Sequence, residues 1–404
     1  MQNYTEITKC RACGSDDLRL VLDLNDQPLA NSFTKDKDEE LPYFPLKLNL
    51  CDKCYHLQLS VKVNPDLLFK NYLYVSGTSQ SLHNYFHNFA YDCNEFCSDT
   101  DRSVLDITCN DGTQLDKFKE MGWKTYGVDP AENLYSISSQ NHHIVCDFWN
   151  ESIASDLLSK TKHFNLITAQ NVFAHTDDIS SFLKACSLVM NEKSTLLIQT
   201  SQADMISNNE FDTIYHEHLS FFNSRSMKEC LNREGFSLVE VRKTPIHGNS
   251  YVFVIKKGKC DEELALEEMK REEDQGLYST ETYLKYADRC LEITSQLKDL
   301  LGKYKNQGKK LVGYGAAAKG NTLLNFSQLS LDYIVDDNPL KWNTYSPGSQ
   351  TPVKEPTVLK EENAENIIVI PLAWNFFDEI KNKTENIIEG PVKYVRYFPV
   401  VETL

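Results

Sequence analysis

The sequence predicts an α/β protein in three parts: a small N-terminal module that carries paired cysteines, a central unit and a C-terminal unit. The cysteines form two close pairs within residues 1–64. Apolar runs of strand length alternate with helical stretches over residues 103–256, and the alternation resumes at residue 309. Such alternation is typical of a mostly parallel sheet covered by helices on both faces. We therefore predict domains at 1–64, 65–256 and 257–404.

Composition and charge narrow the class of protein. The chain has 404 residues, of which 41% are hydrophobic and 25% charged, as in ordinary globular proteins. Its net charge of −16 disfavours a nucleic acid partner, which needs a basic face, but leaves a small anionic ligand possible. No apolar run is long enough to cross a bilayer, and no signal pattern is present. We expect a cytoplasmic protein without a membrane partner, as a monomer or weak homodimer.

Four of the twelve cysteines have the spacing of metal ligands. Cys10-x-x-Cys13 and Cys51-x-x-Cys54 each allow two thiolates to bind one tetrahedral Zn²⁺. The long gap between the two pairs predicts a strand insertion inside the module. Four thiolates leave no open coordination position, so we predict a structural zinc site rather than a catalytic one. Unrelated thiols are the alternative.

The central unit is predicted from apolar runs in chain order. Strands are predicted at "SVLDITC", "KTYGVD", "HHIVCD", "FNLITAQNVF", "STLLIQTS", "SLVEVRK" and "SYVFVIKK". Helices are predicted between them at "TQLDKFKEMG" and "DDISSFLKACSLVM". The last two strands are close in sequence, which favours an antiparallel hairpin at one edge of the sheet.

The flanking segments are helical in pattern. Residues 65–100 are aromatic, and residues 261–308 form a long charged stretch whose charges we interpret as a solvated helix face. A second small α/β unit follows, with predicted elements at "KKLVGYGAAAKGNTLLNF", "LDYIVDDNP", "NIIVIPLAWNFFDEI" and "PVKYVRYF".

A cofactor loop is predicted at "VLDITCNDGTQLDKF", which reads as a strand, a tight loop and a helix. Asp106 ends the strand and Gly112 allows the turn. Asp129 ends the next strand, where it can accept two ribose hydroxyls, and Asp147 and Phe148 end a third, where an adenine can be met. Open α/β sheets bind ligands at the carboxyl ends of their strands. The three clusters therefore predict a nucleoside-containing cofactor.

Two cofactors compete for this loop. A dinucleotide needs G-x-G-x-x-G to make room for its pyrophosphate. Here Thr108 and Asn110 occupy the other slots and Gly112 is the one glycine. S-adenosylmethionine (SAM) has no phosphate and tolerates such a loop. With Asp129 and Asp147 in register we predict SAM; a non-binding structural turn is the alternative.

These features occur together with further motifs: "YLYVSGTS", "CNDGT", "GVDPAEN", "NVFAHTDD", "YHEHLSFF", "GYGAAAKGNTLLN" and "VDDNPLKWNTYSPGSQTPV". Over nearly its full length the chain resembles the SAM-dependent sugar C-methyltransferases that act on nucleotide-linked 4-keto-deoxysugars. The resemblance implies an N-terminal zinc-binding module and a central class I SAM-methyltransferase domain with a Rossmann-like fold. It also implies a C-terminal Rossmann-like domain that helps to bind the nucleotide-diphosphate-sugar substrate.

The resemblance also implies which residues meet SAM. They are Asp106, Thr108, Asn110, Asp111, Gly112, Asp129, Pro130, Asp147, Phe148 and Asn171. Thr108 departs from the family, which usually has Gly or Ala at this position. Its hydroxyl either donates to the methionine carboxylate or its bulk crowds that group.

Methylation of a carbon next to a ketone explains the stretch "FDTIYHEHLSFF". The enzyme must remove a weakly acidic proton, for which His is the usual base, and must offer the enolate oxygen a donor. By resemblance His218 is the base, Tyr215 is a donor and Glu217 is an orienting carboxylate. His175 resembles the family's second active-site histidine. We expect His216, the other histidine of the motif, to point away from the chemistry.

 The pair Phe221 and Phe222 is expected in the core.

Two tyrosines precede the central unit. Tyr72 and Tyr74 in "NYLYVSGTS" either reach the active site from the linker, Tyr72 toward the chemistry and Tyr74 toward the substrate, or pack the domain junction.

The C-terminal unit carries its own glycine-containing loop. In "LVGYGAAAKGNTLLN", Gly315 allows close approach to a helix N-terminus, where phosphate is favoured, and Lys319 adds a cation. Alone such a loop also suits NAD. The resemblance implies a site near the substrate diphosphate that includes Gly315, Lys319, Asn321 and Asp336, although a plain turn explains Asp336 equally well.

Three functions are compatible with these observations. The resemblance favours C-methylation through an enolate at the carbon next to the ketone, C-3, of a nucleotide-linked sugar. An O- or N-methyltransferase on the same class of substrate is the second. A non-catalytic protein that binds SAM or a nucleotide sugar is the third, and Thr108 keeps it open.

Overall fold

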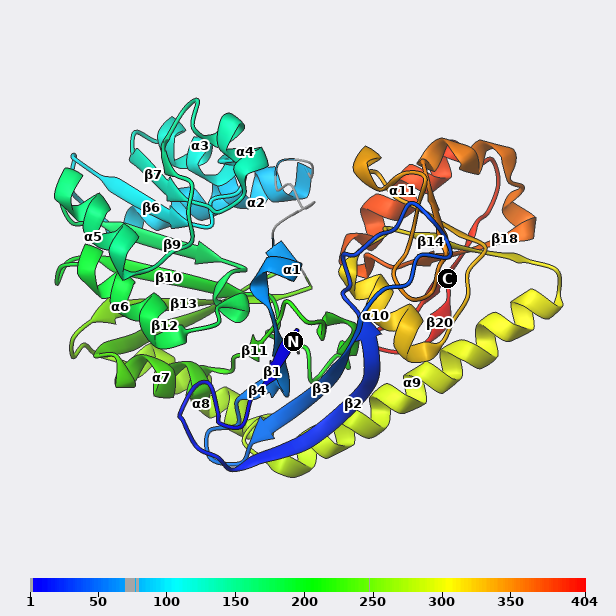
Figure 1. Ribbon diagram of the computed structural model, residues 1–404, viewed down its shortest axis with the longest axis horizontal. Helices are drawn as coiled ribbons and strands as arrows, with labels where there is room; N and C mark the ends of the chain where they lie inside the picture. Colours follow the sequence, from blue (N-terminus) through cyan, green and yellow to red (C-terminus); the bar gives the residue numbers. More distant parts are fainter. Residues whose placement is uncertain (1–2, 70–76, 78–79, 247) are drawn as a thin grey trace.

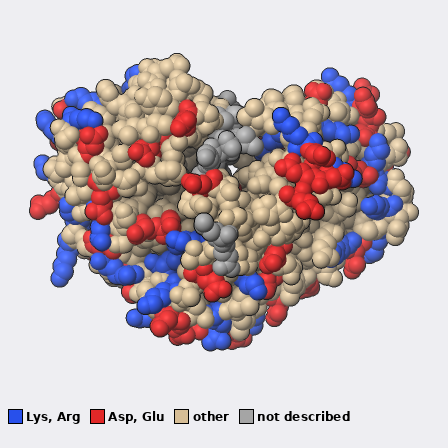
Figure 2. Space-filling view, in the orientation of Figure 1, with Lys and Arg blue, Asp and Glu red and all other residues tan. Residues whose placement is uncertain are grey.

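The protein consists of two lobes joined beneath by a long β-ribbon and a long helix (Figure 1). The computed structural model describes every residue except 1–2, 70–76, 78–79 and 247. Tyr72 and Tyr74 therefore lie outside the described residues. In the part of the chain that is described, no helix is both long enough and apolar enough to cross a membrane. On the face shown in Figure 2, Lys and Arg are interspersed with Asp and Glu and form no continuous basic surface.

The N-terminal module is built on an antiparallel sheet in the order β11-β4-β3-β2. Its strands are β2 (Leu18–Pro28), β3 (Tyr43–Cys51), β4 (Leu57–Leu59) and β11 (Ser220–Phe221). A small pair, β1 (Tyr4–Glu6) with β5 (Val61–Val63), lies beside it. The ribbon β2–β3 is the strand insertion expected between the cysteine pairs. The fourth strand, β11, comes from the middle of the chain, which the sequence analysis did not predict.

The central sheet has the order β12-β13-β10-β9-β6-β7-β8. Its strands are β6 (Ser103–Ile107), β7 (Lys124–Val128), β8 (His143–Val145), β9 (Leu166–Gln170), β10 (Thr195–Thr200), β12 (Phe236–Thr244) and β13 (Ser250–Lys257). The five strands from β10 to β8 are parallel, while β13 runs antiparallel to both β10 and β12. The seven predicted strands and the edge hairpin are confirmed.

Helices cover both faces of this sheet. They are α2 (Gln80–Asp92), α3 (Thr113–Glu120), α4 (Glu132–Ser138), α5 (Glu151–Lys160), α6 (Ile179–Val189) and α7 (Ser224–Arg233). Successive side chains of a strand point to opposite faces, so Val104 packs with α2 and α3 while Leu105 packs with α5, α6 and α7. Helix α7 begins after Asn223, whose side chain accepts a hydrogen bond from the backbone N–H of Ser226 at 2.8 Å.

The C-terminal unit is a second α/β sheet in the order β16-β17-β15-β14-β18-β19-β20. Its strands are β14 (Lys310–Tyr314), β15 (Tyr333–Val335), β16 (Thr344–Tyr345), β17 (Pro352–Lys354), β18 (Ile367–Pro371), β19 (Lys393–Arg396) and β20 (Glu402–Thr403). Its main helices are α10 (Ala318–Ser327) and α11 (Phe377–Ile387). The pairs β16–β17 and β19–β20 are antiparallel, so the sheet is mixed.

The charged stretch ahead of this unit forms two helices, α8 (Glu263–Asp274) and α9 (Thr280–Asn306). One face of α9 is buried at helical spacing, for example at Tyr286, Cys290, Ile293 and Leu297. These side chains join a single apolar core that also contains residues of β2, β3, α10 and the connection 201–223. The connection after β10 is therefore not a surface loop but lies where the three parts of the protein meet.

Candidate active site and zinc site

A cavity of about 350 Å³ lies at the carboxyl ends of β6, β7 and β9, where the strand order of the central sheet reverses. Its lining includes eight of the predicted site residues. They are Asp106, Thr108, Asn110, Asp129, Pro130, Phe148, Asn171 and His175. Asp111, Gly112 and Asp147 do not line it: Asp111 accepts a hydrogen bond from Gly77 N at 2.8 Å, and Asp147 is exposed.

The loop after β6 makes a tight backbone ribbon. Thr108, Asn110 and Gly112 all have positive φ, at 62°, 53° and 86°. Glycine and asparagine tolerate this conformation, but a β-branched residue is strained in it. The Thr108 hydroxyl donates to the carbonyl of Ile107 at 2.6 Å. The glycine pattern of this loop thus reflects three left-handed positions, of which Thr108 is the unfavourable one.

Asp129 fastens this loop to the neighbouring strand. Its Oδ2 accepts from Asn110 N and its Oδ1 from Ala131 N, both at 2.8 Å. Burial raises the pKa of Asp129 above its ordinary value. Each carboxylate oxygen has a further lone pair, so the contact with a ribose that the sequence predicts stays compatible with these two bonds.

The electrostatics of the cavity fit a cationic ligand. Asp106 is buried and accepts from Thr168 Oγ1 at 2.7 Å, and desolvation raises its pKa to about 7. Asp129, Asp177 and Asp178 also line the cavity, and no Lys or Arg is among its described lining residues. A sulfonium and an ammonium group would favour the ionised form of these acids, whereas a pyrophosphate would be repelled. The lining therefore fits SAM better than a dinucleotide.

Two histidines meet at the edge of this cavity. His175, in the short helix η3 (Phe173–His175), lines it, and its ring centroid is 4.9 Å from that of His218. Burial lowers the pKa of His175 to about 4, so its imidazole is neutral at pH 7. The ring of Tyr215 lies 4.0 Å from that of His218. Residues predicted from two distant motifs are thus brought together.

The tautomer of His218 follows from its hydrogen bond. Nδ1 lies 2.7 Å from the carbonyl oxygen of Thr213, which can only accept. Nδ1 therefore carries the proton, and Nε2 is the basic nitrogen of the neutral ring. Gln202 Nε2 lies 3.5 Å from the same Nδ1, too far to compete with the Thr213 bond.

The side chains of Glu217 and His216 both face the N-terminal module rather than His218. Glu217 is buried, accepts from Asn31 Nδ2 at 2.6 Å, and has its pKa raised to about 7 by desolvation. His216 packs edge-on against Phe44, with Nε2 at 3.3 Å from the Phe44 carbonyl oxygen, and burial lowers its pKa to about 4. His216 thus points away from His218, as the sequence analysis expects.

Phe221 and Phe222 are 4% and 2% exposed and belong to apolar clusters, which confirms that both are core residues.

The predicted C-terminal site residues surround the loop after β14. Gly315 has φ 92°, and a Cβ there would lie 2.8 Å from the Cβ of Ala373. Asp336 accepts from Ala316 N at 2.6 Å and from Asn338 N at 2.8 Å, the same arrangement that Asp129 makes in the central domain. These contacts are structural, and the substrate role of Asp336 stays a prediction.

The remaining two predicted residues of that site face other parts of the chain. Asn321 is buried and donates to the carbonyl of Ala30 at 2.7 Å. The Lys319 ammonium lies 4.4 Å from the centroid of the Trp374 ring. This ammonium also lowers the pKa values of two buried acids, Glu210 and Asp212. Desolvation has the larger effect and raises these pKa values to about 7 and 6. The sequence analysis missed these two acids because nothing local marks them as partners of Lys319.

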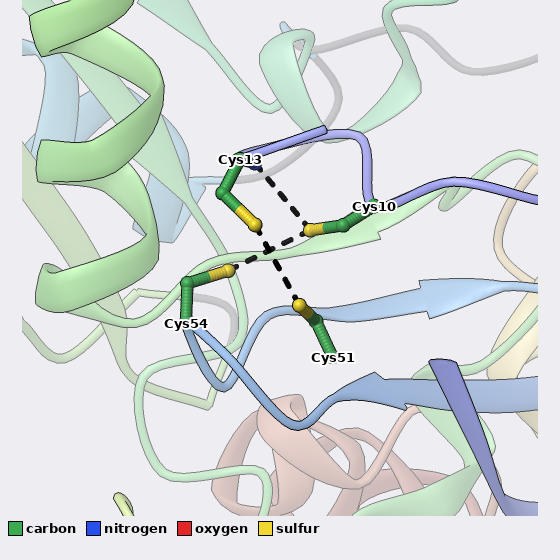
Figure 3. A group of neighbouring side chains, drawn as sticks. All are labelled: Cys10, Cys13, Cys51 and Cys54. Atoms are coloured by element: carbon green, nitrogen blue, oxygen red, sulfur yellow. Dashed lines mark hydrogen bonds between the residues drawn. The ribbon is translucent and has the colours of Figure 1, made fainter. Parts of the chain in front are cut away.

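The four cysteines form the predicted cluster (Figure 3). Their sulfur atoms all lie within 4.8 Å of one another, with Cys10–Cys54 and Cys13–Cys51 both at 3.6 Å. Tetrahedral zinc with Zn–S bonds of about 2.3 Å requires sulfur atoms about 3.8 Å apart. The four thiolates therefore fit one zinc ion.

Two similar turns present these sulfurs. Gly14 N donates to the Cys10 carbonyl at 2.8 Å, and Tyr55 N to the Cys51 carbonyl at 2.9 Å; both donors have positive φ. Cys10, Cys51 and Cys54 share an apolar cluster with residues of α7. The zinc site thus belongs to the core of the central domain as well as to the module.

Comparison with known families covers nearly the whole chain. Residues 10–69 match a putative zinc binding domain, residues 82–241 a methyltransferase domain and residues 245–399 a C-methyltransferase C-terminal domain.

Two curated proteins illustrate the extent of similarity. The C-methyltransferase NovU of Streptomyces niveus is 29% identical over 97% of this chain and 96% of its own length. A ubiquinone biosynthesis O-methyltransferase of Rhodopseudomonas palustris is 25% identical over 24% of this chain and 39% of its own length. A solved S-adenosylmethionine-dependent methyltransferase of Clostridium acetobutylicum is 15% identical, with a TM-score of 0.34 over 44% of this chain and 92% of that one.

Metal analysis should find one zinc per chain, and Cys51→Ser should lose the metal and lower the melting temperature, because structural zinc contributes folding free energy directly. Cys260→Ser, at an exposed cysteine outside the cluster, is the control and should change neither. A metal-free protein that melts at an unchanged temperature would contradict the zinc assignment.

Thr108→Gly should raise the free energy of unfolding by about 1 kcal/mol, because it relieves about 1–3 kcal/mol of left-handed strain at an entropic cost of about 0.4–1 kcal/mol. Since Thr108 lines the cavity, the same change should shift SAM affinity in calorimetry. Asn343→Gly removes another left-handed residue, in the C-terminal unit, and should leave SAM affinity unchanged. Equal SAM affinities for all three proteins would remove Thr108 from the ligand.

Glu217→Gln should raise the melting temperature at pH 8 but not at pH 5. The pKa of Glu217 is raised to about 7, above the value of about 4.3 in an unfolded chain. The folded state therefore holds a proton that the unfolded chain releases, and the resulting stability falls as pH rises from about 4.3 and is lost above 7. Glu229→Gln, at an exposed position, should show no such difference between the two pH values. A pH-independent effect of Glu217→Gln would contradict the raised pKa.

Proposed function

The chain belongs to the C-methyltransferase family that combines an N-terminal zinc-binding domain, a SAM-dependent methyltransferase domain and a C-methyltransferase C-terminal domain, and we propose that its substrate is a nucleotide-linked 4-keto-deoxysugar. Methylation occurs at the carbon next to the ketone, C-3, through an enolate. The observation that carries this proposal is the pair of imidazoles, with ring centroids 4.9 Å apart, at the edge of an acid-lined cavity.

His218 is the general base. Because its Nδ1 proton is held by the Thr213 carbonyl, Nε2 accepts the proton from the sugar carbon, and the electron pair of the C–H bond forms the enolate. The resulting imidazolium lies beside the ring of His175, which is neutral and therefore does not repel the new positive charge. The Tyr215 hydroxyl is the donor proposed for the enolate oxygen.

SAM, when bound, supplies an electrophilic methyl group on a positively charged sulfur. Asp129 and the backbone of the loop after β6 would hold its ribose and methionine portions, and Asn171 would face the methyl donor. Glu217, held by Asn31, keeps the segment of His218 oriented and adds no negative charge while it is protonated. Exclusion of water from this buried site strengthens each of these contacts.

The C-terminal unit holds the nucleotide diphosphate. Gly315 and Lys319 lie where the strand order of the second sheet reverses, between β14 and β18, which is the usual ligand position in such sheets. The N-terminus of helix α10 favours phosphate. The ammonium of Lys319 can bind the phosphate in place of the nearby acids. We assign Asn321 and Asp336 to the same substrate site, and the substrate role predicted for Tyr74 falls outside the described residues.

The base can be tested apart from methyl transfer. Enzyme and a 4-keto nucleotide sugar are incubated in D₂O with S-adenosylhomocysteine, which has no methyl group to give. Deuterium should enter the position next to the carbonyl, as followed by NMR. His218→Asn should lower this exchange and methylation about a hundred- to ten-thousand-fold while SAM still binds, because the general base is lost.

His216→Asn is the matched control for this experiment, because it removes the other imidazole of the same motif, which faces Phe44. It should retain most of the exchange. A dead His216 variant with an active His218 variant would reverse the assignment. Product NMR that finds the new methyl on oxygen or nitrogen would replace C-methylation by the other transferase reaction.

A further inference from the structure

Arg11 lies inside the first cysteine pair but reaches out of the zinc-binding module. Its backbone N–H donates to Gln58 Oε1 at 2.8 Å, and Gln58 Nε2 donates to the carbonyl of Lys9 at 3.0 Å. Gln58 is fully buried, so these two hydrogen bonds hold the turn that carries Arg11 in place. The side chain is therefore directed by the same turn that presents Cys10 and Cys13.

The guanidinium of Arg11 contacts both segments that carry the active-site histidines. Its Nη2 donates to the carbonyl oxygens of Thr176 and of Asp177, the latter at 3.0 Å. These residues directly follow His175. Its Nε donates to Ser220 Oγ at 3.0 Å, two residues after His218. One planar group thus joins two segments that are far apart in the sequence.

Arginine suits this position for a chemical reason. Its guanidinium is planar and stays charged, and it presents several donors in a fixed fork, whereas the ammonium of lysine is a point charge on a flexible stem. Burial lowers the pKa of Arg11, and the carboxylates of Asp177 and Asp178 oppose that effect. Asp177 is itself paired with Lys62 of β5 at 2.9 Å, a second link between the module and the same segment.

We propose that Arg11 is a positioning residue that holds the segments of His175 and His218 in register, so that the zinc-bearing turn is part of the active-site scaffold. The proposal rests on the role of the two histidines in the proposed function. Zinc then affects turnover through Arg11 without contact to substrate or cofactor. Displacement of a catalytic group by about 1 Å can cost about a hundredfold in rate.

Kinetics of Arg11→Ala and Arg11→Lys test this. Both variants should lose about tenfold to a hundredfold in kcat, while SAM affinity, zinc content and substrate KM change less than about threefold. Guanidinium ion at millimolar concentration should restore part of the kcat of Arg11→Ala, because it can fill the vacated site, and should not restore Arg11→Lys.

Arg233→Ala is the matched control. Arg233 of α7 donates from Nη1 to the carbonyl of Ala12 at 2.9 Å, so it contacts the same cysteine turn. Among the described residues no hydrogen bond joins it to either histidine segment. It should keep kcat within about twofold. Loss of zinc in Arg11→Ala, or equal losses of kcat in the Arg11 and Arg233 variants, would overturn the positioning role in favour of a general structural one.

A readout without substrate separates this proposal from the proposed function. Histidine rings labelled with ¹³C are observed by NMR, and the signals of His175 and His218 are assigned with Asn variants. Arg11→Ala should move both signals and Arg233→Ala neither. Ser220→Ala, which removes only the Nε acceptor, should move the signal of His218 more than that of His175 and serves if Arg11→Ala does not fold. Unchanged histidine signals in Arg11→Ala would overturn the proposal even if the sugar substrate is confirmed.

Discussion

Burial of the connection between β10 and α7 is the constraint on which the rest of this structure depends. Phe211, Ile214, Leu219 and Phe221 insert into one core with residues of the N-terminal ribbon, α9 and α10. Large apolar side chains contribute about 1.5–3 kcal/mol each when buried, so this contact alone joins the three parts firmly. A buried connection must also satisfy its backbone, and it does so by pairing β11 with β4 and by donation from Thr322 Oγ1 to the carbonyl of Ile214.

Burial also sets the protonation of the candidate active site. Desolvation disfavours charge, so it keeps His175 neutral and raises the pKa values of Asp106 and Glu217 toward 7. The imidazole of His175 therefore carries no charge near neutral pH, and Glu217 keeps its proton up to about pH 7. A neutral His175 places no like charge beside the imidazolium that the proposed base His218 would become.

The sequence by itself determined the features that depend on short-range chemistry. The strands of the central sheet follow from apolar runs, and the zinc cluster follows from the spacing of two cysteine pairs. The loop after β6 was recognisable because Gly112 and the acids at successive strand ends are local signals. His175 and His218 were predicted separately, each from its own motif, by resemblance to a family.

Tertiary structure alone decided which of these features meet. Nothing near Arg11 in the sequence indicates that it contacts the segments after His175 and His218, and nothing near Asn31 indicates Glu217 as its partner. Nor does any local pattern predict that Ser220 and Phe221 complete the sheet of the N-terminal module. Ser220 pairs with Gln58, which lies more than 150 residues earlier in the chain. Such contacts arise because apolar faces that are distant in the chain must be buried together, and their geometry exists only once that common core has formed.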